Sequence, residues 1–131
     1  MNIYRIFVLA LAGLGFLGFG VWFLIDPIAP LAAIGITATG APAPTEFRAF
    51  YGGLEVGLGA LMLAATVKPE WRTPGLWLVL ATNGGIAAGR LLGVAIDGVW
   101  VPFFTVALVW ELGFVVLAAV GLWGASKAKS T

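Results

Sequence analysis

Apolar residues in this chain form four long, nearly continuous runs separated by short polar stretches. Each run is long enough to cross the hydrocarbon core of a bilayer as a helix, and they cover residues 4–25, 46–66, 74–96 and 101–123. Asp26 and Pro27 end the first run, and Asp97 and Gly98 mark a turn after the third. The pattern predicts an all-α protein with one domain, residues 1–131, folded as an integral membrane four-helix antiparallel bundle.

The connections give the expected helix boundaries. Residues 26–45 form the longest connection and contain four prolines around an apolar run that is too short to span a membrane. We expect this segment to be a short helix or turn that lies at the membrane surface or folds over the mouth of the bundle, or else a loop without regular structure. Thr45 before Glu46 predicts a capped helix start, and Thr73 before Pro74 predicts another.

Composition supports a membrane protein and excludes several kinds of chemistry. The chain is 61% hydrophobic and 10% charged, whereas soluble domains are about 45–50% apolar and about 25% charged. The net charge of +1 offers no basic surface for nucleic acid. With no cysteine and no histidine, the chain cannot form disulfides or the usual thiolate and imidazole metal sites, so we expect no metal or cofactor.

The basic residues predict the orientation in the membrane. They lie at the N-terminus, in the second connection and at the C-terminus, and they are Arg5, Lys68, Arg72, Lys127 and Lys129. The first and third connections contain no lysine or arginine. By the positive-inside rule, both termini are expected in the cytoplasm, with the chain in the inner (plasma) membrane and residues 26–45 on its outer side.

Three of the four runs contain ionisable side chains near or within the expected outer half of the membrane. By helical spacing, Arg48, Tyr51 and Glu55 share one face of the second run, and Asn83 and Arg90 share one face of the third. Glu111 lies near the middle of the fourth run. An unpaired charge at the centre of a span costs about 2.5–3.5 kcal/mol, so such groups are expected to face the bundle interior and to pair. We predict that Arg90 lies between Glu55 and Glu111, and that the remaining three side chains complete the hydrogen bonds.

Two interpretations of these six residues remain open. In the first, they determine which helices pair, and the protein is a non-enzymatic structural or accessory component. In the second, they line a pocket open to the outer side, where a small lipid with an anionic headgroup, a polar solute or a proton could bind or be transported. An enzyme is the third and least favoured class, because histidine and cysteine are missing and the two carboxylates lie near arginines.

Small residues in the second and third runs predict close helix contacts. Gly52 and Gly59 share the polar face of the second run, where they would let a neighbouring helix approach. Two ridges at four-residue spacing point elsewhere, and they consist of Ala49, Gly53 and Gly57, and of Gly85, Gly89 and Gly93. We therefore expect the second helix to have neighbours on both sides. A membrane-protein partner or a homo-oligomer is compatible with these ridges.

Several short motifs resemble those of a known family. They are Arg48-x-x-Tyr51-Gly52-Gly53 with Gly57, Gly89-Arg90, Asp97-Gly98 and Glu111-Leu112. Together they resemble a bacterial family of small membrane proteins that is classified as a domain of unknown function and is distantly similar to the DoxX-like group. The resemblance implies a compact four-helix membrane protein with a polar cluster. The DoxX-like group is linked to membrane redox partners and lipid-related roles, so the resemblance implies no single reaction.

Overall fold

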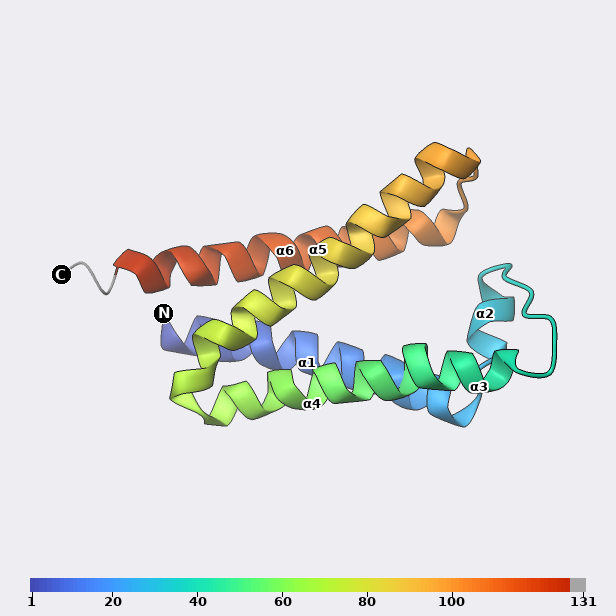
Figure 1. The fold of residues 1–131 in the computed structure, drawn as a ribbon. Helices are drawn as coiled ribbons and strands as arrows, with labels where there is room; N and C mark the ends of the chain where they lie inside the picture. The colour runs from blue at the N-terminus through green and yellow to red at the C-terminus, as the bar shows by residue number, and fades with distance from the viewer. Residues whose placement is uncertain (128–131) are drawn as a thin grey trace.

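A computed structural model of the chain describes the backbone of residues 1–127 and the side chains of residues 1–124. The described residues form helices and no strand (Figure 1). The elements in chain order are α1 (Asn2–Ile25), α2 (Ala29–Ala33), α3 (Ala43–Phe47), the π-helix η1 (Arg48–Gly53), α4 (Leu54–Val67), the 3₁₀-helix η2 (Pro69–Trp71), α5 (Arg72–Asp97) and α6 (Pro102–Lys127). Lys129, one of the residues used to predict the orientation, lies outside the described residues.

Four helical segments are long and apolar enough to cross a membrane, which confirms that part of the prediction. They are Asn2–Ile25, Ala43–Val67, Pro69–Asp97 and Pro102–Gly124. The second segment is continuous from α3 through η1 into α4. A large share of their apolar side chains is exposed on the isolated chain, including Ile3, Leu92 and Val109. This is the surface expected of helices surrounded by lipid or by another protein.

Two predicted helix starts are wrong. The second long helix begins at Ala43, before Thr45, and the third begins at Arg72 after the turn η2, before Thr73. No side-chain cap hydrogen bond forms at either start. Prolines in the first turn explain the difference, because the first backbone N–H groups of a helix have no intrahelical partner and proline loses nothing there. The helices can therefore extend beyond the threonines.

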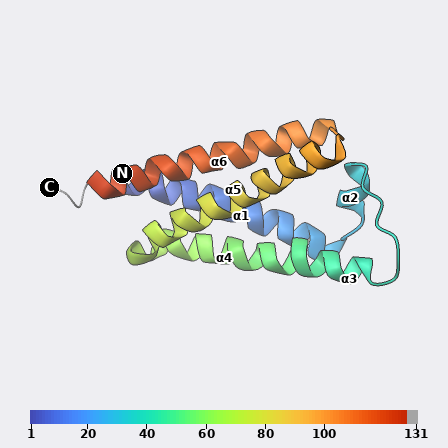
Figure 2. The same cartoon turned by 45° about the horizontal axis from the view of Figure 1, so that its top comes forward.

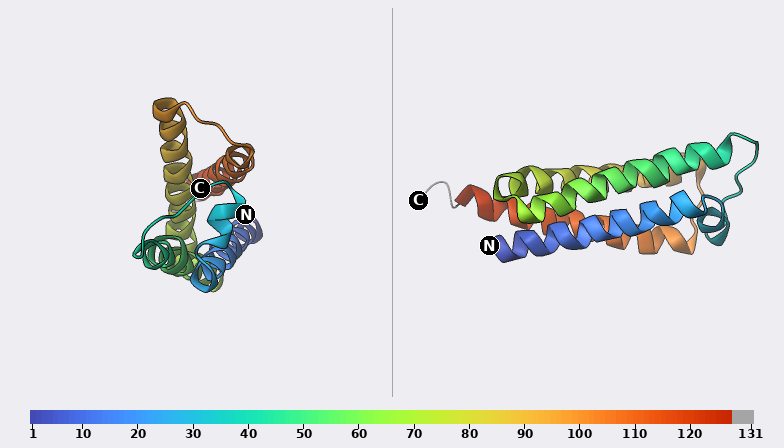
Figure 3. Two further views of the ribbon diagram at one scale, coloured as in Figure 1. Left: turned by 90° about the vertical axis from the view of Figure 1, so that its right-hand side faces the viewer. Right: turned by 90° about the horizontal axis from the view of Figure 1, so that it is seen from below.

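The long helices are arranged as two pairs. α1 packs mainly against α4 and η1, and α5 packs mainly against α6 (Figures 1 and 2). The N-terminus, the α4–α5 connection and the C-terminal part of α6 lie together at what we call the terminal end. The short helix α2, α3 and the α5–α6 connection lie at the opposite end, the loop end. The two pairs approach each other at the terminal end and diverge toward the loop end (Figures 1 and 3).

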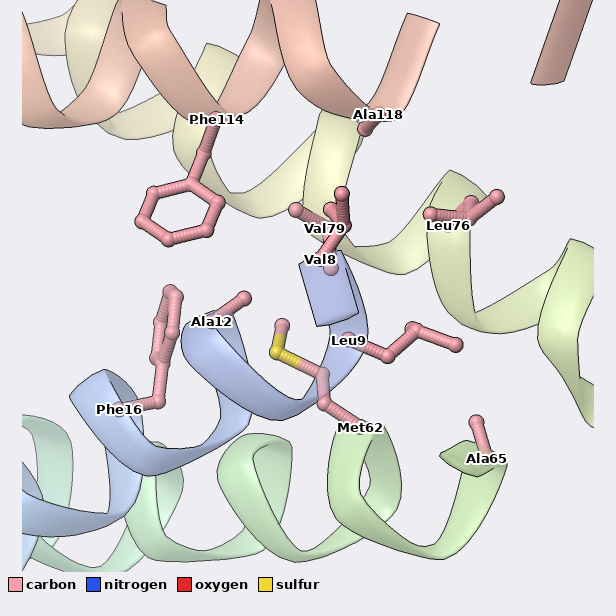
Figure 4. Packing of buried hydrophobic residues seen from close by; sticks show 10 residues of the cluster. All are labelled: Val8, Leu9, Ala12, Phe16, Met62, Ala65, Leu76, Val79, Phe114 and Ala118. Carbon is pink, nitrogen blue, oxygen red and sulfur yellow. The ribbon is translucent and has the colours of Figure 1, made fainter. Parts of the chain in front are cut away.

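A filled apolar core joins the two pairs at the terminal end. Its side chains come from all four long helices and point toward one another (Figure 4), and they are Val8, Leu9, Ala12, Phe16, Met62, Ala65, Leu76, Val79, Phe114 and Ala118. Two hydrogen bonds also join α1 to α6 there. The hydroxyl of Tyr4 donates to the carbonyl of Leu117 over 2.8 Å, and Nε of Arg5 donates to the carbonyl of Gly121 over 3.2 Å.

Glycines bring the backbones of α1 and α4 into contact. A Cβ on Gly59 would lie 2.7 Å from the backbone nitrogen of Leu17 and 2.8 Å from the carbonyl oxygen of Gly13. A Cβ on Gly20 would lie 2.8 Å from the carbonyl oxygen of Gly52. The close approach predicted at Gly52 and Gly59 is confirmed, because only glycine leaves room for these contacts.

The predicted ridges of small residues pack against no other helix of the described chain. A Cβ on Gly57, Gly85, Gly89 or Gly93 would meet no other described atom within 4 Å. The second helix packs against α1 and, through Met62 and Ala65, against α5, but no neighbour covers its Gly57 ridge within the described residues. α1 occupies one side of the second helix, and the side that carries Gly57 stays open.

The connection between α1 and α3 is organised by Asp26. Its Oδ1 accepts hydrogen bonds from the backbone N–H groups of Ala29, over 3.0 Å, and Ile28, over 3.1 Å. These bonds, led by the one from Ala29, hold the pKa of the Asp26 carboxyl below its usual value. They start α2, which buries Leu31. A short helix therefore lies at the loop end.

The contact between α1 and α4 gives a direct test with a matched control. Gly59→Ala puts a methyl group against two backbone atoms of α1, so we expect it to destabilise the protein by about 1–3 kcal/mol through overpacking. Gly57→Ala makes the same exchange in the same helix where no atom lies within 4 Å. It should be neutral or slightly stabilising, because alanine favours helix over glycine. Thermal unfolding in detergent measures both, and equal losses would contradict the assigned contact.

Candidate functional site

A large cavity lies in the half of the molecule where the two helix pairs diverge. Its volume is about 1100 Å³. Side chains from α1, from the second helix, from α5 and α6, and from the segment after Asp26 line it, including Leu31 of α2. It is open to its surroundings, because the lining residues Phe50, Leu54, Ile86 and Val106 are exposed. The apolar core bounds the cavity on the side of the terminal end, and Phe16 belongs to both the core and the cavity lining.

Aromatic rings form much of the cavity wall. On the side of α1 and the second helix, Phe19 packs on Phe23 with ring centroids 4.8 Å apart, and Phe23 stacks on Tyr51 at 5.2 Å. Tyr51 also contacts Phe47 at 5.7 Å. The facing helix α6 contributes Phe103, Phe104 and Trp110. The wall thus offers a broad apolar surface with aromatic faces on both sides.

One buried ion pair joins α5 to α6 at the cavity wall. Nη2 of Arg90 lies 2.7 Å from Oε1 of Glu111, and Nε of Arg90 donates to Oε2 over 3.4 Å. Glu111 is buried, with its side chain 7% exposed. The guanidinium carbon of Arg90 also lies 5.4 Å from the ring centroids of Phe103 and of Phe104. The predicted pairing of Arg90 with Glu111 is confirmed, and it engages both carboxylate oxygens.

Glu55 stays outside this pair. It is half-buried and lines the cavity, but it accepts no hydrogen bond and forms no ion pair within the described part of the chain. The prediction that Arg90 lies between two glutamates is therefore wrong. The guanidinium group of Arg90 binds Glu111 on the adjacent helix α6. There, Nε and Nη2 of Arg90 can each donate a hydrogen bond to one carboxylate oxygen of Glu111.

The other three predicted members make local contacts instead. Nε of Arg48 donates to the carbonyl of Leu24 over 3.1 Å. Leu24 lies in the last turn of α1, whose carbonyls lack intrahelical partners, so this bond caps that helix. Asn83 is buried and donates to the carbonyl of Val79 in its own helix over 2.9 Å. The hydrogen-bond role predicted for Arg48, Tyr51 and Asn83 around Arg90 is therefore wrong.

Five of the six predicted binding residues nevertheless line one cavity. They are Tyr51, Glu55, Asn83, Arg90 and Glu111, whereas Arg48 is exposed outside it. Their role in binding stays a prediction. No group of three or more His, Cys, Asp or Glu side chains placed to bind a metal occurs among the described residues.

Sequence reasoning missed the aromatic wall and the π-helix. Phe19, Trp22 and Phe23 recur at helical spacing on one face of the first run, which could have indicated that this face turns inward. The π-helix at Arg48–Gly53 has no comparable signal beyond its paired glycines. Such single turns often occur at functional sites, and this one carries Tyr51 on the cavity wall.

The ion pair gives a second test. Arg90→Ala leaves the buried carboxylate of Glu111 unpaired, so we expect a loss of about 3–5 kcal/mol in the free energy of unfolding. The double variant Arg90→Leu with Glu111→Leu removes both charges and should recover most of that loss. Glu55→Gln breaks no pair and removes an unpaired acidic group, so it should leave the free energy of unfolding unchanged or raise it. Thermal unfolding of the three variants in the same detergent measures these differences in stability. A double variant as unstable as Arg90→Ala would contradict the conclusion that Arg90 stabilises the protein by pairing with Glu111.

Comparison with known proteins identifies a family for this chain but no individual relative. No curated protein and no solved structure matches the chain. A family model described as "Domain of unknown function (DUF4345)" matches residues 4–122, which overlap all four membrane-length segments and include the whole lining of the cavity. The predicted membership of a family of unknown function is thereby confirmed, and the chain belongs to the DUF4345 family.

Proposed function

We propose that this protein binds a lipid-like amphiphile in the cavity between its helix pairs, and that it is not an enzyme. The observation that carries the proposal is the cavity itself, of about 1100 Å³, with mainly apolar and aromatic walls and a few polar side chains. Small-molecule sites combine these two features, because apolar walls supply affinity and a few polar groups fix the orientation. A molecule with a large apolar part and a small polar group fits this lining.

Access to the cavity supports a ligand from the membrane phase. Ile86 and Leu54 line the cavity, lie within membrane-length helices and are exposed. In a bilayer such positions face acyl chains, so an amphiphile could enter sideways without crossing water. The filled core at the terminal end supports binding rather than transport, because it leaves no polar path through that half of the bundle.

The proposal includes a membrane orientation. The four helices cross a plasma (inner) membrane as an antiparallel bundle, with both termini in the cytoplasm and the cavity in the outer half. The basic residues Arg5, Lys68 and Arg72 at the terminal end support this orientation, as does the absence of lysine and arginine from residues 26–45. Bacterial origin and a distant similarity to the DoxX-like group stay predictions from the sequence.

An accessory role is the second candidate function. The observation that favours it is the open ridge on α5, where Gly85, Gly89 and Gly93 meet no other described atom within 4 Å of an added Cβ. A ridge of small residues lets a helix of another membrane protein, or of a second copy, approach closely. In this role the cavity would be covered by the partner.

Native mass spectrometry on protein extracted gently from its own membrane tests the proposal. We expect a small amphiphile to remain bound to the wild type. Gly18→Phe should abolish its retention, because Gly18 lines the cavity and has open space for a ring. Gly57→Phe is the matched control, since Gly57 also has open space but does not line the cavity. It should retain the ligand as the wild type does.

The other outcomes separate the two candidates. Only loosely held bulk lipid, in equal amounts on all variants, would contradict amphiphile binding. A protein partner at fixed stoichiometry that survives Gly18→Phe and is lost in Gly89→Phe would establish the accessory role instead.

A further inference from the structure

We infer that the ligand is a hydrophobic cation, an amine or a quaternary onium compound, whose charge is balanced by Glu55. The inference rests on the proposed function and specifies the chemical class of its ligand. It follows from the charges that line the cavity, from their partners, and from the rings next to Glu55.

The cavity lining has an excess of negative charge. Its charged residues are Glu46, Glu55, Arg90 and Glu111, which are three acidic groups and one basic group. Arg90 and Glu111 neutralise each other through the ion pair. Glu46 is exposed. Glu55 is therefore the acidic group inside the cavity that no cation of the described chain balances, and a bound cation would stabilise its ionised form.

The two arginines in the half of the molecule that holds the cavity do not supply the missing partner. Arg90 is occupied by Glu111 and lies against two phenylalanine rings, and Arg48 donates to the carbonyl of Leu24 outside the cavity. An unpaired carboxylate within a span is costly, by about 2.5–3.5 kcal/mol at its centre. A bound cation removes that cost, and this gives a cationic ligand an advantage over a neutral one of the same shape.

The walls next to Glu55 suit a large cation rather than a metal ion. Tyr51 lies one helical turn before Glu55 and stacks on Phe23, and Phe19 extends the row of rings. Aromatic faces attract organic cations electrostatically as well as by apolar contact. Phe103 and Phe104 already contact a cation in this way, since both flank the guanidinium of Arg90.

The same contacts disfavour the anionic headgroup considered from the sequence. An anion would compete with Glu111 for the positive charge of Arg90, because Nε and Nη2 of Arg90 already donate to that carboxylate. The buried amide of Asn83 donates to its own helix. An anion in the cavity would also meet the carboxylate of Glu55.

Two probes of nearly equal shape and opposite charge test the inference. Tetraphenylphosphonium is the cation and tetraphenylborate the anion, and each is titrated into the full chain in neutral detergent, with protein-free micelles subtracted. We expect saturable binding of the cation at one per chain. Glu55→Gln should weaken it at least tenfold, while anion binding stays equal or rises. Glu55→Asp, which keeps the charge, should bind the cation better than Glu55→Gln does.

Glu46→Gln is the matched control, because it removes the same charge from an exposed position of the same lining. It should weaken cation binding less than threefold. Cation binding that is unchanged in Glu55→Gln, or tetraphenylborate that binds the wild type as tightly as the cation does, would overturn the assignment. If both probes are then lost in Gly18→Phe, the cavity still binds amphiphiles and only the charge preference is wrong. If neither probe binds and no amphiphile copurifies, the proposed function fails as well.

Discussion

The backbone contact between α1 and α4 is the constraint on which the rest of the structure depends. Gly13, Gly20, Gly52 and Gly59 contribute no side chain of their own to the contact between the two helices, so the pair is held close along much of its length. Close packing on this side leaves the polar side chain of Glu55 on the wall that faces α5 and α6. The second pair meets the first mainly at the terminal end, through the apolar core and through hydrogen bonds such as those from Tyr4 and Arg5 to α6. A cavity at the loop end is the consequence.

The charges divide in the same way as the packing. Arg90 and Glu111 lie on adjacent helices of one pair and satisfy each other, so their interaction stabilises the α5–α6 pair without reaching across the cavity. Arg48 caps α1 within the other pair. In the half of the molecule that holds the cavity, each helix pair therefore satisfies its own arginine. Glu55 is left with no partner in the described chain, and we propose that it sets the chemical preference of the cavity.

Binding and structural roles are thus separated by position in this molecule. Core side chains such as Met62 and Leu76 fill the terminal end, where the two hydrogen bonds from Tyr4 and Arg5 also tie α1 to α6. The aromatic and polar side chains at the loop end are not needed to fill space, since they surround a cavity. Stability can rest on one half of the bundle while the other half remains available to a ligand.

The sequence by itself determined the helical class, the four membrane-length segments and the identity of five cavity-lining polar residues. These follow from hydropathy and from the cost of charges in apolar spans, which act on each segment separately. Only the tertiary structure decided which charges meet. Arg90 could reach either glutamate by the spacing along its helix, and the choice of Glu111 depends on which helices are adjacent and on the angle between the two pairs. The cavity likewise depends on the angle between the two helix pairs. The positions of polar residues along each helix do not determine that angle.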